Sequence, residues 1–385
     1  MGTSSNAGKE QNRVRIFDTT LRDGMQTPGL AASKCQRVTL AENIASLNPN
    51  VMEIGMPANP KDYDLIPDIA RAIYDVNPNV AVAMLCRSRD VDFERFEMLA
   101  QDMPNKKVLH FYVPISDILM KNSVSMGKSE VLDVVAKYAD LAVSKGYDVE
   151  FSGEDAAATA DFDFLYKVYE KAYASGCNVL NVPDTTGWVA SRDYGDRIAS
   201  LVQAFPDAVL STHCHNDAGL AIANSLTAVT YGARQVEGTV LGLGERAGNA
   251  DWLVLACALY AQKESIAPVC NYTSFTDVVK DVAQTLDIGI PFNYPIFGQN
   301  AFRTESGGHT NAILKDKSSY YRLDPSFVGT TDELVIGKTS GKHVVADRLQ
   351  RLGVTVSSLD NVVAKALDYC MEHGSIPDEV LKSYC

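Results

Sequence analysis

Residues 108–143 read VLHFYVPISDILMKNSVSMGKSEVLDVVAKYADLAV and contain one complete unit of the predicted fold. The apolar, β-branched run Val108–Ile115 predicts a strand, and a polar loop follows it. Beyond the loop, apolar residues recur at intervals of three and four, which predicts a helix with one buried face made of Val131, Val134, Val135, Tyr138 and Leu141. The unit is therefore a strand, a loop and a helix.

The same unit recurs along the chain from residue 15. The other predicted strands are Arg15–Thr20, Val51–Met56, Val80–Cys86, Asp148–Glu154, Val179–Thr185, Val209–His215 and Gln235–Leu243. Successive units of this kind require parallel strands joined by right-handed crossovers. Eight of them in about 250 residues match the size of an α/β (β/α)8 TIM barrel. A doubly wound sheet is the alternative, but no GxGxxG turn follows the first strand.

The pattern changes after residue 264. Asp287–Gln299 contains two glycines and two prolines, which predicts a linker, and the remainder predicts helices, one with the apolar face Leu359, Val362, Val363, Ala366 and Cys370. We therefore predict a disordered tail (1–14), a catalytic barrel (15–285), and a linker with small, mainly helical C-terminal subdomains (286–385). The last segment is too short for a large independent core, so we expect it to pack on another surface. No C-terminal regulatory domain is expected.

The composition excludes several classes of protein. Apolar residues make up 46% of the 385 residues and charged residues 22%, which is typical of a globular protein. With 35 basic and 48 acidic residues the formal charge is −13, which disfavours nucleic acids and anionic membranes as partners. No apolar run approaches the roughly 18 residues of a membrane span. Eight cysteines without a CxxC pair indicate reduced thiols and a cytoplasmic location.

His213-Cys214-His215 is the sharpest chemical signal in the sequence. Side chains two residues apart on a strand face the same side, so both imidazoles are expected at the barrel mouth, where such barrels place their chemistry. Two neutral imidazoles and a carboxylate suit a divalent metal, and Asp23 in DTTLRDG (18–24) is the natural third ligand. Two hydrogen-bonded core histidines are the alternative. Cys214 is expected to face the helical layer.

Two further residues have less specific signals. Arg22 can hydrogen-bond a developing oxyanion through its rigid fork of donors, although a turn with a surface Arg–Asp pair is the alternative. Asn249 closes the glycine-rich stretch that follows the eighth strand. It can complete the metal site, or it can simply cap a helix.

Six stretches of the chain resemble the 2-isopropylmalate synthase and homocitrate synthase family. They are DTTLRDG (18–24), EIGMPA (53–58), DVEFSGEDA (148–156), NVPDTTG (181–187), HCHNDAGLAIANS (213–225) and VEGTVLGLGERAGNA (236–250). The resemblance runs in order over roughly residues 15–345. Members are (β/α)8-barrel acyltransferases that join acetyl-CoA to a 2-oxo acid by Claisen condensation. The resemblance therefore implies acetyl-CoA as co-substrate, a divalent metal (Mg, Mn or Zn) and a place in amino-acid biosynthesis.

The resemblance also implies residue roles. Asp23, His213 and His215 resemble the family's metal ligands, with Asn249 close by or coordinating. Arg22 resembles the group that stabilises the keto oxygen as it becomes an alkoxide. The residues expected at the active site and substrate are, in addition, Glu154, Thr185 (for the substrate carboxylate), Gln26 and Ser152.

His309, in SGGHTNA, resembles a histidine that the C-terminal segment inserts into the partner subunit's barrel. This likeness implies a domain-swapped homodimer. His309, helped by Glu154 or a nearby tyrosine, is the expected general base that removes a proton from the acetyl methyl group. Water then hydrolyses the thioester and releases CoA.

Departures from the family bear on the acceptor. Glu150 stands where lysine-pathway homocitrate synthases carry an arginine, so we expect it at the substrate, where a carboxylate would repel 2-oxoglutarate. Residues 113–117 and 336–343 instead resemble nitrogenase-type homocitrate synthases. Met25 replaces the glutamate of the family's RDGEQ, and we expect it to admit a bulkier or more anionic acceptor. The activity predicted is that of a 2-isopropylmalate synthase acting on 2-oxoisovalerate; the alternatives are homocitrate synthase, citramalate synthase and phosphonomethylmalate synthase.

Two other classes of function remain as rivals. The 3-hydroxy-3-methylglutaryl-CoA lyases share the barrel and metal site but carry a GLGGCP-type loop with a catalytic cysteine, where this chain reads GLGERA (242–247). A non-enzymatic binding protein is the third possibility, since Met25 is compatible with a decayed site. The retained Asp23, His213, His215 and His309 argue against it.

Overall fold

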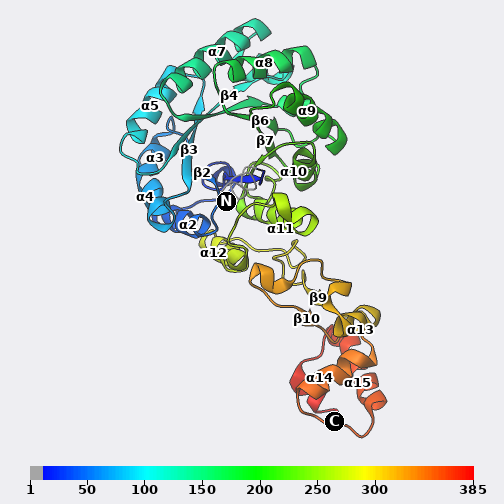
Figure 1. The fold of residues 1–385 in the computed structure, drawn as a ribbon. Helices are drawn as coiled ribbons and strands as arrows, with labels where there is room; N and C mark the ends of the chain where they lie inside the picture. Colours follow the sequence, from blue (N-terminus) through cyan, green and yellow to red (C-terminus); the bar gives the residue numbers. More distant parts are fainter. Residues whose placement is uncertain (1–11) are drawn as a thin grey trace, which may run out of the picture. The chain divides into compact units, whose positions relative to one another are not determined.

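The computed structural model describes residues 12–385. Eight parallel strands, each bonded to the next and the last to the first, form a closed barrel, so the predicted TIM barrel is confirmed (Figure 1). The strands are β1 (Arg15–Asp18), β2 (Val51–Glu53), β3 (Ala81–Arg87), β4 (Lys107–Pro114), β5 (Asp148–Glu154), β6 (Val179–Asp184), β7 (Val209–Cys214) and β8 (Gln235–Gly238).

Helices surround the barrel and cover the outer face of the strands (Figure 1). They are α2 (Lys34–Ser46), α3 (Pro60–Tyr63), α4 (Ile66–Val76), α5 (Asp90–Ala100), α6 (Asp117–Leu119), α7 (Lys128–Ser144), α8 (Phe162–Ala174), α9 (Ser191–Ala204), α10 (Ala221–Thr230) and α11 (Trp252–Lys263). In α7 the predicted face is the packed one, because Val131, Val135 and Tyr138 are buried. Burial of such faces against the strands is the main stabilising contribution of the outer layer.

The barrel's contacts begin before the predicted start at residue 15. Residues 1–11 of the predicted tail lie outside the described residues. Val14, by contrast, is buried in a cluster with Val236 and Leu255. Its backbone N–H donates to the carbonyl of Ile266 over 2.8 Å, so this residue belongs to the barrel rather than to a tail.

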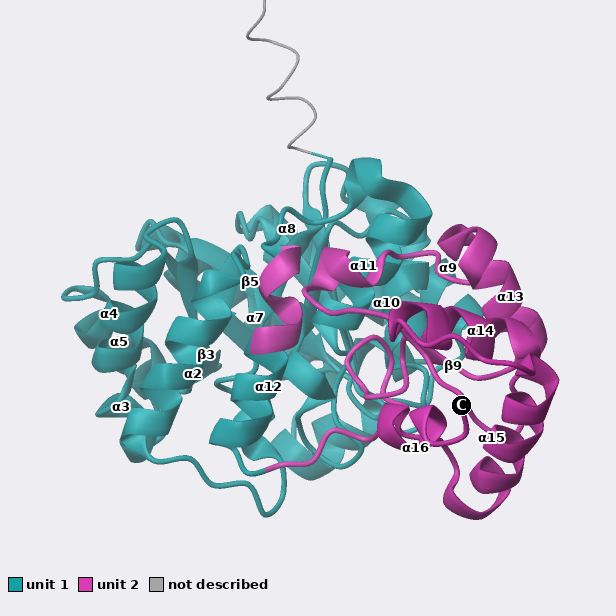
Figure 2. Ribbon diagram, turned by 90° about the horizontal axis from the view of Figure 1, so that it is seen from below, with its two compact units in different colours: residues 1–271, 278–287 teal, residues 272–277, 288–385 magenta. Residues whose placement is uncertain are grey.

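The chain divides into two compact units (Figure 2). The first contains the barrel and Val278–Asp287, and the second contains Tyr272–Asp277 and Ile288–Cys385. Helix α12 (Phe275–Thr285) therefore belongs to both units. Residues 287–299, where the linker was predicted, form neither helix nor strand.

The second unit has an apolar core of its own, which the sequence analysis did not expect. It contains a two-stranded parallel sheet, β9 (Arg303–Thr304) with β10 (Glu333–Leu334), and helices α13 (Gly307–Lys315), α14 (Lys342–Arg351), α15 (Leu359–His373) and α16 (Asp378–Lys382). The face predicted for residues 359–370 packs into this core, with Val362, Ala366 and Cys370 buried. The core also draws Val344, Val345 and Leu349 from α14.

All eight cysteines are free thiols and most are buried, as expected from their spacing. Cys214 faces away from the barrel axis as predicted, and its Sγ lies 3.3 Å from the hydroxyl of Thr212. Among residues 12–385, no helix combines the length and apolar character that crossing a membrane requires.

Candidate metal and substrate site

A cavity of about 300 Å³ opens at the carboxyl ends of the barrel strands. Every strand or the loop that follows it contributes to its wall. The lining residues are Arg22, Asp23, Gln26, Met56, Leu85, His110, Tyr112, Ser152, Glu154, Asn181, Pro183, Thr185, His213, His215, Glu237, Glu245 and Arg246. The position is the one at which (β/α)8 barrels place their chemistry.

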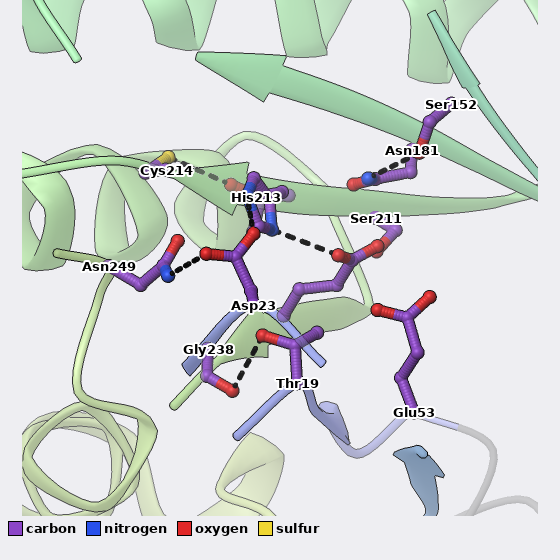
Figure 3. A network of polar contacts seen from close by, with 12 residues as sticks. Thr19, Asp23, Glu53, Ser152, Asn181, Ser211, His213, Cys214, Gly238 and Asn249 are labelled. Atoms are coloured by element: carbon purple, nitrogen blue, oxygen red, sulfur yellow. Dashed lines mark hydrogen bonds and ion pairs between the residues drawn. The ribbon is translucent and has the colours of Figure 1, made fainter. Parts of the chain in front are cut away.

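Three predicted ligands converge at one side of this cavity. Asp23 follows β1, His213 lies in β7 and His215 comes directly after it. Ligand atoms of the three side chains all lie within 4.8 Å of one another. The two Nε2 atoms are 3.3 Å apart, and Asp23 Oδ2 lies 3.7 Å from His213 Nε2 (Figure 3). The spacing of the two histidines along the chain thus places both imidazoles on the inner side.

Hydrogen bonds at the far ring nitrogens orient both imidazoles. His213 Nδ1 donates to Glu237 Oε2 over 3.0 Å, and His215 Nδ1 donates to the carbonyl of Gly248 over 3.2 Å. Burial lowers the pKa of both histidines to about 4. Both rings are therefore neutral at pH 7 and turn the lone pair of Nε2 toward Asp23, which is the form that a metal ligand needs.

Asp23 is ionised although it is buried. Burial alone would raise its pKa, but the guanidinium of Arg22 holds the pKa well below its usual range. Asn249 Nδ2 donates to Asp23 Oδ1 over 2.7 Å and to the carbonyl of Leu243 over 2.9 Å (Figure 3). Within the described residues the Oδ1 of Asn249 is buried with no hydrogen-bond partner. One charged oxygen, two imidazole nitrogens and this unpaired amide oxygen form a donor set that fits a divalent cation.

Arg22 is held between two carboxylates at the cavity wall. Its Nε donates to Glu53 Oε2 over 2.5 Å and its Nη1 donates to Asp23 Oδ2 over 2.6 Å. The side chain is only 10% exposed, and this exposed part faces the cavity. A buried guanidinium fixed in this way is preorganised to stabilise negative charge that develops beside Asp23.

Glu53 starts a polar chain that crosses the cavity floor. Glu53 Oε1 accepts from His110 Nδ1 over 2.7 Å, and His110 Nε2 lies 2.8 Å from Ser152 Oγ, which also accepts from Asn181 Nδ2 over 2.8 Å. Burial opposes a charge on His110, but the carboxylate of Glu53 raises its pKa to about 9. His110 is therefore protonated at neutral pH and forms a buried ion pair with Glu53. The sequence analysis assigned no role to Glu53 or Asn181.

His110 also lies close to Glu150 and Glu237, and the three could by proximity hold a cation. Both nitrogens of His110 are already engaged, one with Glu53 and the other with Ser152. No imidazole lone pair is available there. This second cluster is therefore a hydrogen-bonded network rather than a metal site.

Glu154 and Thr185 lie on the cavity wall. Among the described residues, no cation forms an ion pair with Glu154. Burial, and then the charge of Asp155, raise the pKa of Glu154 to about 7, so this carboxylate is a base poised near neutral pH. The hydroxyl of Thr185 accepts from the backbone N–H of Asp155 over 3.0 Å, which leaves its own hydrogen available to the cavity. Gln26 and Ser152 also line the cavity.

Two residues predicted at the substrate do not line the cavity. Glu150 is 1% exposed, and its carboxylate accepts from the amide of Gln235 over 2.8 and 2.9 Å. Burial and the neighbouring Glu237 raise the pKa of Glu150 to about 8, so it carries little charge at pH 7 and cannot act as the predicted repulsive wall. Met25 is half-buried in the short turn Gly24–Gln26, and its neighbour Gln26 takes the place at the cavity.

His309 lies in the second unit, in α13, where its ring stacks on Tyr320 with a centroid separation of 4.1 Å. It is exposed there. Glu237 and Arg246 line the cavity although no role was predicted for them. The sequence did contain a signal for Glu237. Side chains two residues apart on a strand share a face, so Glu237 faces the barrel interior together with Gln235 of the same strand, Gln235–Gly238.

The chain matches two family models. Residues 13–282 match the HMGL-like model, and residues 296–371 match the model described as homocitrate synthase post-HMGL domain-like. The 2-isopropylmalate synthase of Pelotomaculum thermopropionicum is 36% identical over 358 residues, which cover 90% of this chain and 68% of that protein. The 2-isopropylmalate synthase of Carboxydothermus hydrogenoformans is 35% identical over 381 residues, covering 96% and 74%.

Solved structures share the fold at lower sequence identity. An HMG-CoA lyase from Bacillus subtilis superposes with a TM-score of 0.63 at 18% identity, over 73% of this chain and 96% of that chain. An HMG-CoA lyase from Acinetobacter baumannii, in complex with coenzyme A and 3-methylmalate, gives a TM-score of 0.59 at 15% identity, over 73% and 93%. These likenesses establish the barrel fold.

Proposed function

The chain belongs to the HMGL-like family, and from this premise we propose that it is an acyltransferase that condenses acetyl-CoA with a 2-oxo acid and releases CoA by hydrolysis of the thioester. The relatives named 2-isopropylmalate synthase support this reaction class. The observation that carries the proposal is the convergence of Asp23, His213 and His215, next to Arg22, in one cavity at the carboxyl ends of the strands.

Asp23, His213 and His215 would hold a divalent cation (Mg, Mn or Zn), and the unpaired Oδ1 of Asn249 would face it. When bound, such a cation supplies Lewis-acid polarisation of the keto group of the acceptor. The neutral state of both imidazoles and the ionised state of Asp23 mean that the protein needs no proton release to present these ligands at pH 7.

The chain's own groups account for the remaining steps. Thr185 offers its hydroxyl hydrogen to the carboxylate of the 2-oxo acid. Arg22, held by Glu53 and Asp23, stabilises the keto oxygen as it becomes an alkoxide. Glu154, whose pKa lies near 7, assists removal of the proton from the acetyl methyl group.

We propose His309 as the principal base, contributed by the second unit of a partner chain in a domain-swapped homodimer. Support for this role comes from the family resemblance of the segment SGGHTNA. We also propose a cytoplasmic location, with which the substrates are consistent. The test mixes two inactive variants, His309→Ala and Asp23→Asn. If His309 acts on the partner's barrel, each mixed dimer regains one intact site and random mixing restores about a quarter of wild-type activity. No recovery contradicts the exchange.

For the acceptor, 2-oxoisovalerate is the first candidate, because the name 2-isopropylmalate synthase of the relatives implies it and the wall includes Met56, Leu85 and Pro183. A second candidate, 2-oxoglutarate or another acceptor with an anionic end, is favoured by the hydroxyl of Ser152 on the cavity wall, beside the protonated His110. Glu150 does not oppose it, because that side chain lies outside the cavity and is largely neutral.

The test is release of CoA thiol from acetyl-CoA in the presence of Mg²⁺, Mn²⁺ or Zn²⁺, against a panel of acceptors. The panel contains 2-oxoisovalerate, pyruvate, 2-oxoglutarate, oxaloacetate and phosphonopyruvate. Acceptor-dependent release that disappears with chelator and in His213→Ala supports the proposal. Release without any acceptor, or cleavage of HMG-CoA to acetyl-CoA and acetoacetate, would replace it with a thioesterase or a lyase. The loop 242–247 argues against the lyase, since it presents Glu245 and Arg246 to the cavity and contains no cysteine.

A further inference from the structure

Trp188 is the most exposed large aromatic side chain at the carboxyl ends of the strands. It lies in the loop between β6 and α9 and is 70% exposed. The chain has only two tryptophans, and the other, Trp252, is fully buried and donates its Nε1–H to Asp18. Among the described residues no ring or cation stacks on Trp188. A single exposed apolar residue is ordinary in itself, but Trp188 is unusual in the way its backbone is held and in its position beside the site.

The backbone on both sides of Trp188 is fixed by buried hydrogen bonds. The carboxylate of Asp184 accepts from the N–H groups of Gly187 over 3.1 Å and of Val189 over 3.4 Å. Asn224 ties the same loop to α10, donating to Asp184 Oδ2 over 3.1 Å and to the carbonyl of Val189 over 2.9 Å. The indole is therefore displayed from a rigid support.

Gly187 brings this support against the loop that carries the proposed metal ligand His215. Its φ is +71°, and a Cβ at this position would lie 2.7 Å from Asp217 Oδ2 and 2.9 Å from the carbonyl oxygen of His215. Only glycine fits such an approach. Its carbonyl also accepts from the N–H of Ala218 over 3.0 Å. Trp188 thus directly follows a glycine that packs against the backbone of His215, a residue of the cavity wall.

The same loop lines the cavity. Thr185 faces it, and the carbonyl of Thr185 accepts from Nη2 of Arg246, another lining residue, over 2.6 Å. Arg246 is fixed in turn by two bonds to Asp217 of 2.8 and 3.0 Å. Trp188 therefore belongs to a loop that lines the cavity at Thr185 and is tied through Arg246 to the loop after β7.

The size of the cavity indicates which part of acetyl-CoA can enter it. A volume of about 300 Å³ accommodates a small 2-oxo acid and an acetyl group, but not the nucleotide of coenzyme A. The nucleotide must therefore lie outside the cavity, over its rim. A purine offers a flat π-face, and an exposed indole on a fixed backbone is well suited to stack on it.

We propose that Trp188 is the stacking platform for the adenine ring of acetyl-CoA at the mouth of the site. This inference rests on the proposed function, because it takes acetyl-CoA as the donor. It assigns donor recognition to a side chain of the loop that follows β6, the same loop whose Thr185 is proposed to bind the acceptor.

Kinetics with two donors tests the assignment. In Trp188→Ala, loss of one base–aromatic stack should raise KM for acetyl-CoA about tenfold, with KM for the acceptor unchanged. Trp188→Phe, which retains a ring, should recover most of the loss. The acetyl thioester of N-acetylcysteamine lacks the nucleotide, so Trp188→Ala should use it as well as the wild type does. Ile118→Ala removes another side chain, 68% exposed, from the same end of the barrel and is the matched control.

Fluorescence gives an independent readout, because Trp252 is buried and Trp188 alone is accessible to ligand. Titration with CoA should quench emission in the wild type and leave Trp188→Phe unchanged. The proposal would be overturned by an unaltered KM for acetyl-CoA in Trp188→Ala, or by an equal loss with the truncated donor. It would also be overturned if the accessibility of Trp188 to acrylamide rose on dilution of the protein, because Trp188 would then be a contact between copies. If the wild type releases no thiol with any acceptor while CoA still quenches Trp188, the proposed function fails and the platform stands.

Discussion

Glu237 offers a sharp test of how the candidate metal site is built. Its Oε2 accepts from His213 Nδ1 over 3.0 Å and thereby keeps the lone pair of Nε2 turned toward Asp23. In Glu237→Ala the ring of His213 loses its only fixed orientation, and the other tautomer places a hydrogen where the metal should bind. Loss of such an outer hydrogen bond weakens metal affinity about 10- to 100-fold, which corresponds to about 1.4–2.8 kcal/mol.

The measurement is equilibrium binding of Mn²⁺ to metal-free protein at pH 7.5. Glu237→Gln keeps a carbonyl oxygen that can accept from Nδ1, so it should bind Mn²⁺ nearly as well as the wild type. Glu245→Ala also removes a carboxylate from the cavity wall, but this carboxylate accepts no hydrogen bond from either histidine. The Glu245→Ala variant should therefore bind Mn²⁺ as the wild type does. Wild-type affinity in Glu237→Ala, or equal weakening in all three variants, would refute the reasoning.

Three further predictions follow from the same geometry. Because the pKa of Glu154 is raised to about 7 and this carboxylate must be ionised to accept a proton, kcat/KM should fall as the pH drops through 7. Glu154→Gln should lower activity and flatten this acidic limb of the pH profile; a limb that persists in Glu154→Gln belongs to another group. Glu53 pairs with both Arg22 and His110, so Glu53→Gln removes the carboxylate bonded to His110 and one of the two bonded to Arg22. It should cost about 3–5 kcal/mol of stability, seen as a shifted urea midpoint; an unshifted midpoint contradicts the buried pairing. Asp23→Asn should abolish Mn²⁺ binding and thiol release together while far-UV circular dichroism stays unchanged; activity without bound metal would exclude the proposed ligand set.

The barrel could be predicted because each strand is an apolar run followed by polar residues, and both features are local. The predicted strand ends were less accurate, since β-branched and apolar residues continue into the loops. The eighth strand ends at Gly238 rather than Leu243, and Val240–Gly242 forms a tight turn in which Leu241 adopts a φ of +59°. Leu243 sits beyond this turn, with a carbonyl that accepts from Thr239 over 2.6 Å.

Alternation along a strand predicts the face of a side chain but not its depth along the barrel axis. Glu150 and Ser152 both face inward from β5, yet only Ser152 reaches the cavity, while Glu150 lies in the layer below and bonds to Gln235 of β8. Depth depends on the stagger between neighbouring strands, which local sequence does not encode.

The polar network of the floor was out of reach for the same reason. Glu53, His110, Ser152 and Asn181 come from β2, β4, β5 and β6, and their contacts exist only once the strands of the barrel are paired in register. The core of the second unit is different. Its helical face was visible in residues 359–370, but the partners in α14 that complete the core come from a segment with few apolar residues.

The central claim is that this cavity forms a carbon–carbon bond between an acetyl group and a 2-oxo acid. The most direct measurement supplies acetyl-CoA labelled with ¹³C in the acetyl group, together with Mn²⁺ and the preferred acceptor, and follows the products by ¹³C NMR and mass spectrometry. The account predicts one product, a 2-hydroxy dicarboxylic acid skeleton that contains both labelled carbons, formed in equal amount to free CoA. Label recovered only as acetate would contradict it.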